Sequence, residues 1–168
     1  VRNAGFKKSD YEAVFKNYLG VSHVIWLGNG IEGDDTHGHI DDLARFVNED
    51  TIITVIETNT KDANYKPLQD NLKRLQAATL ETGKKPNIVT LPMPERLEFD
   101  GVRLPASYAN FLILNKTVLV PTFNDAKDRE ALNILAECFP DREIIGINAT
   151  DFIWGFGTLH CLSQQLPK

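Results

Sequence analysis

The sequence predicts an α/β fold that is assembled from repeated strand–strand–helix–strand units. Amphipathic helical periodicity centres near positions 14, 72 and 133, so it recurs about every sixty residues. Each helical stretch is followed by a short apolar run that is typical of a strand. A hairpin expected before the last helix completes its unit. No sequence identity is visible between the copies, so we interpret the repeat as one of structure.

Local signals place the individual elements. Ser9 and Glu12 have the spacing of a capping box, and the apolar periodicity that follows ends at Gly20, which favours the left-handed conformation that closes a helix. In chain order, the further elements that we expect are a strand over 22–27, a short helix that begins near His39 or Ile40 and includes Leu43, Phe46 and Val47, a strand over 51–56, a helix that includes Leu68, Leu72, Leu75 and Leu80 and ends near Gly83, a strand over 88–91, an irregular segment over 95–105, strands over 108–114 and 117–120 joined by a tight turn at Asn115 and Lys116, a helix over 128–139 and a strand over 143–147.

The first unit is incomplete on its N-terminal side. Its helix lacks the two strands that should precede it, and the chain begins with Val1 instead of an initiator Met. We therefore expect that residues precede Val1 in the complete protein, or that another chain supplies the missing strands, because open strand edges invite unwanted pairing.

Composition narrows the class of protein. The chain has 168 residues, of which 42% are hydrophobic and 24% are charged, as in ordinary globular proteins. The 23 acidic and 18 basic residues give a net charge of −5, which argues against a nucleic-acid partner and suits a cationic substrate. No uninterrupted apolar segment has the length of a membrane span. Two cysteines make no disulfide framework, so we expect a cytoplasmic, reducing setting.

The stretch 33–42 is rich in groups that handle protons and cations. It holds four carboxylates and two histidines in a loop that follows an expected buried strand. His39 and Asp41 are two residues apart, so their side chains can reach the same pocket. We expect the neighbouring Asp34 and Asp42 to be solvated loop or N-cap carboxylates.

A metal site is the alternative interpretation of the same stretch. Asp35, His37, His39 and Asp41 would offer a divalent ion the mixed oxygen and nitrogen ligands that it accepts. Their spacing matches no metal-binding signature, so this interpretation is the weaker one.

Cys161 is the candidate nucleophile. It follows a flexible Gly-X-Gly turn and His160, and polar residues follow it, whereas Cys138 lies within an expected helix, where a small apolar role fits it. A nucleophilic cysteine needs a stabilised thiolate and an imidazole that moves protons. We therefore expect the segment around Cys161 to meet the 33–42 loop in space.

Several motifs together are similar to those of one enzyme family. They are Val24-Ile25-Trp26-Leu27, Gly33-Asp34-Asp35-Thr36, Gly38-His39-Ile40-Asp41, Leu43-Ala44-Arg45-Phe46, Arg96-Leu97, Ala106-Ser107-Tyr108-Ala109-Asn110-Phe111, Cys138-Phe139-Pro140-Asp141-Arg142 and His160-Cys161-Leu162-Ser163-Gln164-Gln165. In this order they resemble agmatine deiminases and bacterial peptidylarginine-deiminase-like proteins over nearly the whole chain, which corresponds to the C-terminal half of that family. Phe156 and Thr158 depart from the Gly and Asn that the family often has at these positions. The segment 95–105 is shorter than the corresponding loop of many agmatine deiminases.

The resemblance implies a fold and a set of roles. The fold is the five-bladed α/β propeller, or pentein, of guanidine-modifying enzymes, of which residues 1–168 would form the C-terminal half. Cys161 would be the nucleophile, His39 the general acid and base, and Asp41 a carboxylate that grips the guanidinium. Asp35 would be an acidic position near the substrate. No metal or organic cofactor is implied, and the partners would be a small cationic guanidine and the N-terminal half, with room for a homo-oligomer.

The activity that this resemblance implies is the hydrolysis of agmatine to N-carbamoylputrescine and ammonia, a step toward putrescine and the polyamines, through a thiouronium intermediate bound to cysteine. Three alternatives stay open at this point. The first is a peptidylarginine or free-arginine deiminase of the same fold, the second is a catalytically inactive truncated half-domain, and the third is a metal-dependent hydrolase.

Overall fold

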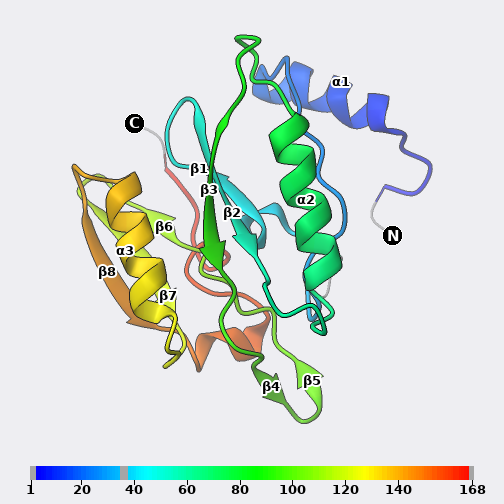
Figure 1. Cartoon of the computed structure of the whole chain (residues 1–168). Helices are drawn as coiled ribbons and strands as arrows, with labels where there is room; N and C mark the ends of the chain where they lie inside the picture. The colour runs from blue at the N-terminus through cyan, green and yellow to red at the C-terminus, as the bar shows by residue number, and fades with distance from the viewer. Residues whose placement is uncertain (1–2, 35–37, 167–168) are drawn as a thin grey trace.

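Two three-stranded sheets, each with one helix, form most of the computed structural model, which describes residues 3–34 and 38–166 (Figure 1). The first sheet holds β1 (Ala44–Phe46), β2 (Thr51–Ile56) and β3 (Asn87–Pro92), and α2 (Tyr65–Ala77) connects β2 to β3. The second holds β6 (Leu112–Ile113), β7 (Thr117–Thr122) and β8 (Glu143–Asn148), and α3 (Asp128–Cys138) connects β7 to β8. The remaining elements are α1 (Lys8–Leu19), the hairpin of β4 (Glu98–Phe99) and β5 (Val102–Arg103), and the 3₁₀ turns η1 (Ile40–Asp42) and η2 (Phe152–Gly155).

Both sheets have the same topology. The outer strand β1 runs antiparallel to β2, which in turn pairs in parallel with β3, and β6, β7 and β8 repeat this pattern. A parallel pair needs a long crossover connection, and α2 and α3 supply it. The predicted strand–strand–helix–strand unit is therefore confirmed for two copies in the described chain.

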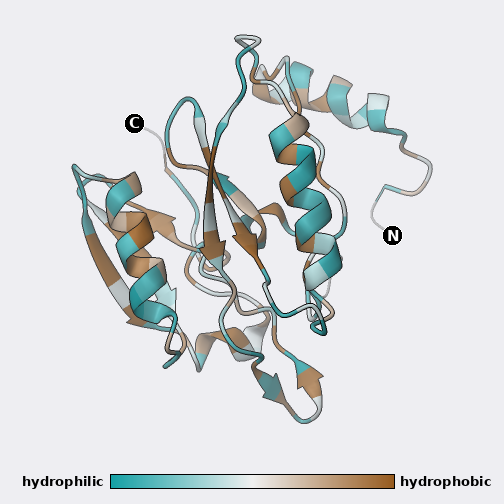
Figure 2. Cartoon of the chain, viewed as in Figure 1, coloured by the Kyte–Doolittle hydropathy of each residue, from teal (hydrophilic) through white to brown (hydrophobic). Residues whose placement is uncertain are grey.

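The core lies where each helix packs on its sheet. Five of the six residues of β2 are buried, because α2 covers one face of the sheet and other segments cover the second. In Figure 2 the strands are largely brown, and the helices carry teal on the sides turned away from them. The helices contribute Leu68, Leu75 and Leu135 to the core, all at most 2% exposed. Within the described residues, no helix combines the length and the apolar character that crossing a membrane requires.

Helix α1 begins before the capping box that the sequence predicted at Ser9 and Glu12. Its N-cap is Lys7, whose backbone N–H donates to the Asp10 carboxylate at 2.7 Å, so the capping box predicted at Ser9 and Glu12 is wrong. Asp10 lies three residues after Lys7, the spacing at which a carboxylate meets the N-cap N–H. The predicted end is confirmed, because Gly20 has a φ of 68°.

The strand predicted over 22–27 is absent from the described sheets. The segment is extended, but side-chain hydrogen bonds hold it instead of backbone hydrogen bonds to a neighbouring strand. Trp26 Nε1 donates to Glu12 Oε1 at 2.8 Å, and the Gly28 N–H donates to Asn71 Oδ1 at 2.6 Å. Its apolar residues Ile25 and Leu27 still pack against the core. The composition correctly indicated an extended, half-buried chain but could not show whether a strand edge lay beside it.

The short helix expected from His39 onward is limited to η1, after which the chain enters β1. The Leu43 carbonyl accepts hydrogen bonds from the Val55 N–H at 3.0 Å and the Thr54 hydroxyl at 3.1 Å, which draw the backbone into the sheet. Leu43 immediately precedes β1 and Phe46 ends it. The helical spacing of these two residues was therefore misleading.

Three other boundaries differ from prediction. The segment 95–105 forms the β4–β5 hairpin, whose turn residues Asp100 and Gly101 have φ angles of 50° and 76°, as the tight turns that favour hairpins require. Helix α2 ends at Ala77, before the buried Leu80. Only Leu112–Ile113 of the expected strand 108–114 joins a sheet.

Candidate active site

The 33–42 loop and the segment around Cys161 meet, as expected. Cys161 Sγ lies 3.2 Å from Asp41 Oδ2, although the two residues are 120 positions apart. Asp41 belongs to η1, and Figure 1 shows the red C-terminal segment turning back from η2 toward the middle of the molecule. There the His160 N–H donates to the Asn110 carbonyl at 3.2 Å, which anchors the turn that carries Cys161.

Asp41 is the carboxylate at the centre of this meeting. Its Oδ2 lies 2.7 Å from His160 Nδ1, and its side chain is 15% exposed. Burial alone would raise the pKa of Asp41, but the hydrogen bonds from His160 and Cys161 together outweigh it and bring the pKa below its ordinary value. Asp41 therefore carries a negative charge at neutral pH, as a group that grips a cation must.

The Cys161 thiol is protonated when the site is empty of cations. Burial, the hydrogen bond to Asp41 and the charges of Asp41 and Asp42 raise its pKa to about 11, against a lowering by the hydrogen bond from Asn110. With this pKa only about one thiol in ten thousand is ionised at pH 7. A cation placed between the sulfur and the carboxylate would reverse the charge effect and favour the thiolate.

Asp42 is buried, contrary to the expectation of a solvated carboxylate. It is 3% exposed, and its Oδ1 accepts a hydrogen bond from Asn110 Nδ2 at 2.9 Å. Burial and then the charge of Asp41 raise the pKa of Asp42 to about 8, so this acid is mostly neutral at pH 7. Adjacent residues of one 3₁₀ turn thus hold an ionised and a neutral carboxyl group.

The raised pKa of Asp42 predicts a pH dependence of stability. An unfolded Asp titrates near 3.8, so between about pH 4 and pH 8 the folded protein keeps a proton that the unfolded chain releases. We expect the free energy of unfolding to decrease across this window in the wild type relative to Asp42→Asn, by at least about 1 kcal/mol. Denaturant unfolding of both proteins at pH 5, 7 and 8.5 measures the difference, and parallel pH curves would contradict it.

His39 is oriented by Asp34, which is also buried and not solvated as expected. Asp34 Oδ1 lies 3.0 Å from His39 Nδ1, and Asp34 Oδ2 accepts the backbone N–H groups of Gly38 at 2.8 Å and His39 at 2.6 Å. The Asp34 side chain is 2% exposed and that of His39 is 40% exposed. One carboxylate therefore sets both the backbone and the ring of His39.

A buried arginine holds the loop that carries Asp34. Arg103 Nη1 pairs with Glu32 Oε2 at 2.9 Å and with Asp62 Oδ1 at 2.8 Å. Gly33, which lies between Glu32 and Asp34 in the chain, adopts a φ of 95°. A Cβ at this position would lie 2.4 Å from the Arg103 carbonyl oxygen. Only glycine permits both this conformation and this approach, so the position of the loop depends on Gly33.

Among the residues that the structure describes, two overlapping clusters near the site have the composition of metal ligands. One consists of Asp34, His39 and Asp42, and the other of Asp41, Asp42 and Cys161, each with ligand atoms within 4.8 Å of one another. The predicted alternative of a metal bound by Asp35, His37, His39 and Asp41 cannot be placed on these clusters, because Asp35 and His37 lie outside the described residues. The role predicted for Asp35 near the substrate lies outside them for the same reason.

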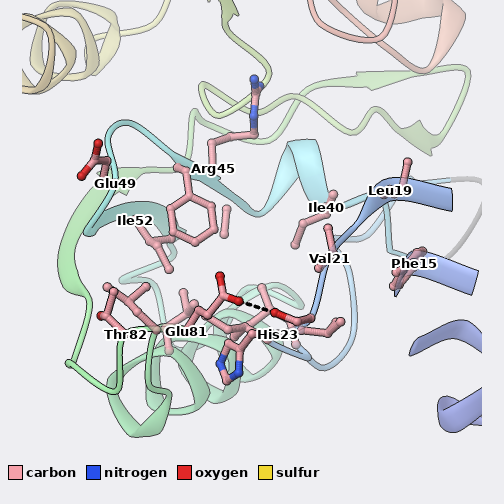
Figure 3. Close-up of a pocket in the computed structure, with 18 of the residues that line it drawn as sticks. Phe15, Leu19, Val21, His23, Ile40, Arg45, Glu49, Ile52, Glu81 and Thr82 are labelled. Atoms are coloured by element: carbon pink, nitrogen blue, oxygen red, sulfur yellow. Dashed lines mark hydrogen bonds between the residues drawn. The ribbon is translucent and has the colours of Figure 1, made fainter. Parts of the chain in front are cut away.

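A large groove lies beside the site without containing the thiol. It has a volume of about 660 Å³ and is lined by apolar residues of α1, the segment after it, β1 and β2 (Figure 3). Ile40 borders it, while the side chain of Arg45 extends away from its floor in Figure 3. Because Cys161 does not line this groove, we place the candidate chemistry at η1 and not in the groove.

The narrow turn before Cys161 gives a testable steric prediction. A Cβ at Gly157 would lie 2.7 Å from Cys161 Cβ and 3.2 Å from its Sγ, so Gly157→Ala must displace the thiol. We expect a loss of about a hundredfold in the kcat/KM of any reaction that uses this sulfur. Gly155→Ala is the matched control, since a Cβ there meets nothing within 4 Å. Equal rates of ammonia release from a guanidine substrate by both variants would contradict the prediction.

Sequence reasoning missed several members of the site. Asn110 donates to Asp41, Asp42 and Cys161, Arg45 fixes the backbone around it, and Asp34 orients His39. Asn110 and Arg45 were visible only as letters within motifs. A single amide between the apolar residues Ala109 and Phe111 is the one local signal that pointed to a buried polar role.

Comparisons with known proteins identify the family to which the chain is similar. A model of the Porphyromonas-type peptidyl-arginine deiminase family matches residues 1–167. A protein of Lactococcus lactis subsp. lactis (strain IL1403), provisionally named an agmatine deiminase, is 36% identical over 99% of this chain and 50% of its own length. The chain thus spans about half the length of the curated relatives it matches.

Solved structures match the fold over the same extent. A Porphyromonas gingivalis structure, provisionally described as an arginine deiminase, is 42% identical with a TM-score of 0.95 over 99% of this chain and 50% of that one. An agmatine deiminase of C. jejuni with substrate bound is 36% identical with a TM-score of 0.87, over 95% of this chain and 46% of that one. The family match covers nearly every residue, and the chain belongs to the Porphyromonas-type peptidyl-arginine deiminase family.

Proposed function

We propose that this chain carries the nucleophile and the acid–base group of a hydrolase that converts agmatine to N-carbamoylputrescine and ammonia. The observation that carries the proposal is the distance of 3.2 Å between Cys161 Sγ and an ionised Asp41 carboxylate. A sulfur beside a fixed anion suits a substrate that is itself a cation, and relatives named for agmatine deimination support the choice of substrate. A cytoplasmic setting, in which thiols stay reduced, suits this chemistry.

The first half of the proposed reaction breaks a carbon–nitrogen bond. Asp41 binds the guanidinium N–H groups and turns the central carbon toward Cys161, while the bound positive charge lowers the pKa of the thiol from its resting value of about 11. The thiol loses its proton to solvent, and the resulting thiolate attacks the carbon to form a tetrahedral adduct. His39 then gives a proton to the departing nitrogen, which leaves as ammonia, and an S-alkylthiouronium remains on Cys161.

The second half releases the product. His39, now neutral, takes a proton from water, and the hydroxide adds to the thiouronium carbon. The carbon–sulfur bond breaks, so that the ureido product leaves and the thiol is regenerated. Because Asp34 engages Nδ1 of His39 at 3.0 Å, we assign both proton transfers to Nε2. No step of this sequence uses a metal or an organic cofactor.

A deiminase of arginine or of arginine residues in peptides is the second candidate. The family model is described by peptidyl-arginine, and the Porphyromonas gingivalis structure at 42% identity is described by arginine. Agmatine lacks the carboxylate of arginine, so the two candidates differ in whether the pocket mouth offers a cation to that group. Within this proposal, the two units described here form part of a five-bladed α/β propeller, and the mouth is shared with the remaining units.

One assay separates the candidates. The complete gene product, with any segment beyond this chain, is incubated in parallel with agmatine, free arginine and an arginine-containing peptide, and ammonia and ureido product are measured. We expect kcat/KM for agmatine to exceed the other two values at least about tenfold. A higher value for arginine or the peptide would move the proposal to the second candidate, and no release from any guanidine would overturn the proposed function. Activity lost on chelation would favour the metal-dependent hydrolase.

A further inference from the structure

We propose that Phe156 is a specificity-determining residue, whose ring forms the apolar wall on which the alkyl chain of the guanidine substrate lies. The inference deepens the proposed function and rests on it, because it takes a guanidinium to be bound at Asp41 beside Cys161. It concerns the part of the substrate that does not react. The substrate class that it names is the guanidines that carry an unbranched alkyl chain.

The backbone of Phe156 has a conformation that aromatic residues rarely adopt. Its φ and ψ are 61° and 24°, in the left-handed region. The other described residues that have a positive φ without being glycine are Asn3, Asp100 and Asn124, whose short polar side chains tolerate it. A bulky side chain in this region is strained, and such residues concentrate at ligand sites. Of these four residues, Phe156 is the one whose type does not fit its backbone.

The left-handed conformation of Phe156 leads the chain into the turn that carries the thiol. Phe156 follows η2, and its N–H donates to the Ile153 carbonyl at 2.9 Å, which closes that 3₁₀ turn. The next residue, Gly157, is buried, and a Cβ on it would lie 3.2 Å from Cys161 Sγ. Since neighbouring Cα atoms are about 3.8 Å apart, the Phe156 Cα lies within about 9 Å of the sulfur. The alkyl chain of a bound guanidine and one aromatic side chain can together bridge this distance.

The ring of Phe156 has no packing role that would explain its presence. It is 39% exposed, and among the residues that the structure describes it is neither a member of the hydrophobic core nor paired with another ring. Other residues of η2 show the contrast. Ile153 is completely buried in the core, and Trp154 stacks on Phe99 with ring centroids 4.0 Å apart. Because the exposed ring stands on a strained backbone and stabilises neither the core nor a ring pair, we infer that its partner is the ligand.

The alkyl chain is the part of the substrate that suits this ring. In the proposed mechanism the carboxylate of Asp41, 3.2 Å from Cys161 Sγ, binds the guanidinium and so recognises its charge. The methylene groups next to the guanidinium are the apolar part of the same molecule, and they gain affinity when they leave water for an aromatic face. Complete burial of a methylene is worth about fourfold in affinity, so a ring that covers one side of the chain accounts for about twofold per methylene.

Binding of alkylguanidines to the complete gene product tests the inference. Cys161→Ser prevents turnover, and calorimetric titration of this protein then gives Kd values for guanidinium, methylguanidine, propylguanidine and pentylguanidine. With Phe156 present we expect the affinity to increase at least about tenfold from methylguanidine to pentylguanidine. In Phe156→Asn we expect an increase of less than about threefold, with an unchanged Kd for guanidinium. Asn is the test residue because it tolerates the left-handed backbone while it removes the apolar surface.

Phe152→Asn is the matched control. Phe152 begins η2 and is 46% exposed, so the same exchange removes an exposed ring from the same turn, four residues farther along the chain from the thiol. Its dependence of Kd on chain length should equal that of the protein with Phe152. Phe156→Leu restores an apolar side chain and should recover part of the dependence. Thermal unfolding verifies the fold of each variant. Should Phe156→Asn unfold, Phe156→Gly gives the same test, because glycine adopts a positive φ readily.

A kinetic measurement with Cys161 in place separates a binding role of Phe156 from a merely structural one. For agmatine we expect Phe156→Asn to raise KM about tenfold and to leave kcat within about threefold, because the ring contacts the chain equally in the ground state and the transition state. A fall in kcat with an unchanged KM would mean that the exchange disturbs the thiol, and it would overturn the assignment.

Failure of this inference differs from failure of the proposed function. An undiminished dependence on chain length in the folded Phe156→Asn variant overturns the role of Phe156 and leaves the proposed function standing. No binding of any guanidine, guanidinium included, overturns the proposed function and the inference with it.

Discussion

Cys161→Ser is expected to lower kcat at least about ten-thousand-fold and to leave the fold unchanged. A serine hydroxyl fits the same space but ionises far less readily than a thiol, and no described group is placed to remove its proton except the acids that already surround it. The residue is exposed, so the exchange removes little buried contact. Ammonia release measures the activity, and circular dichroism with thermal unfolding measures the fold.

Cys138→Ser is the control for this experiment. Cys138 ends α3, where it is partly buried against the core, and burial followed by the charge of Glu137 raises the pKa of its thiol. We expect the control to keep the wild-type rate within about threefold, since it lies outside the site. Turnover by Cys161→Ser at the rate of this control would remove Cys161 from the mechanism.

His39→Ala is expected to lower kcat about a thousandfold, the size of effect that a lost general acid and base has. Without His39 the departing nitrogen receives no proton, and water lacks a base in the second step. Asp34 then keeps its contacts to two backbone N–H groups, so the loop should hold its position. Steady-state ammonia release, together with ureido product formation in a single turnover, separates the two steps.

Variants of two other histidines test whether His39 is the general acid and base. His23 is exposed and contacts the Thr79 carbonyl at 2.6 Å, so His23→Ala should leave the rate unchanged. His160 contacts Asp41 at 2.7 Å, so His160→Ala should mainly raise KM by loosening the carboxylate that binds the cation. If His160→Ala instead loses kcat a thousandfold while His39→Ala turns over rapidly, the proton transfers belong to His160.

Strands could be predicted where composition and neighbours agreed. The β-branched run 51–56 coincides with β2, because the strand is buried in the middle of its sheet and nothing competes with its local preference. The run 22–27 ends in the apolar stretch Val24-Ile25-Trp26-Leu27 but has no strand beside it in the described chain. The Asp100-Gly101 turn is an opposite example, in which a local signal was present but no strand was predicted. An Asp-Gly dipeptide between Phe99 and Val102 is typical of a hairpin, and these two residues pair across the turn.

From the sequence, the site residues could be predicted only where the residue type itself indicates a chemical role. Cys161, His39 and Asp41 stand out by chemistry and spacing, and their assigned roles stay predictions. The burial of Asp34 and Asp42 is a tertiary property, because the loop is closed over them by Arg103 and Asn110, which are distant in the chain. A carboxyl group in a polar stretch gives no local sign that its pKa will rise to about 8.

The reacting centre draws on three widely separated parts of the chain. Asp41 comes just before the first sheet, Asn110 from the connection between the sheets, and Cys161 from the segment that follows the second sheet. Any warming that lets one sheet shift against the other by an ångström disrupts this alignment, while each sheet keeps its own ladder. The proposed activity should therefore be lost at a lower temperature than the secondary structure, so the rate of ammonia release would be an early indicator of heat damage in this fold.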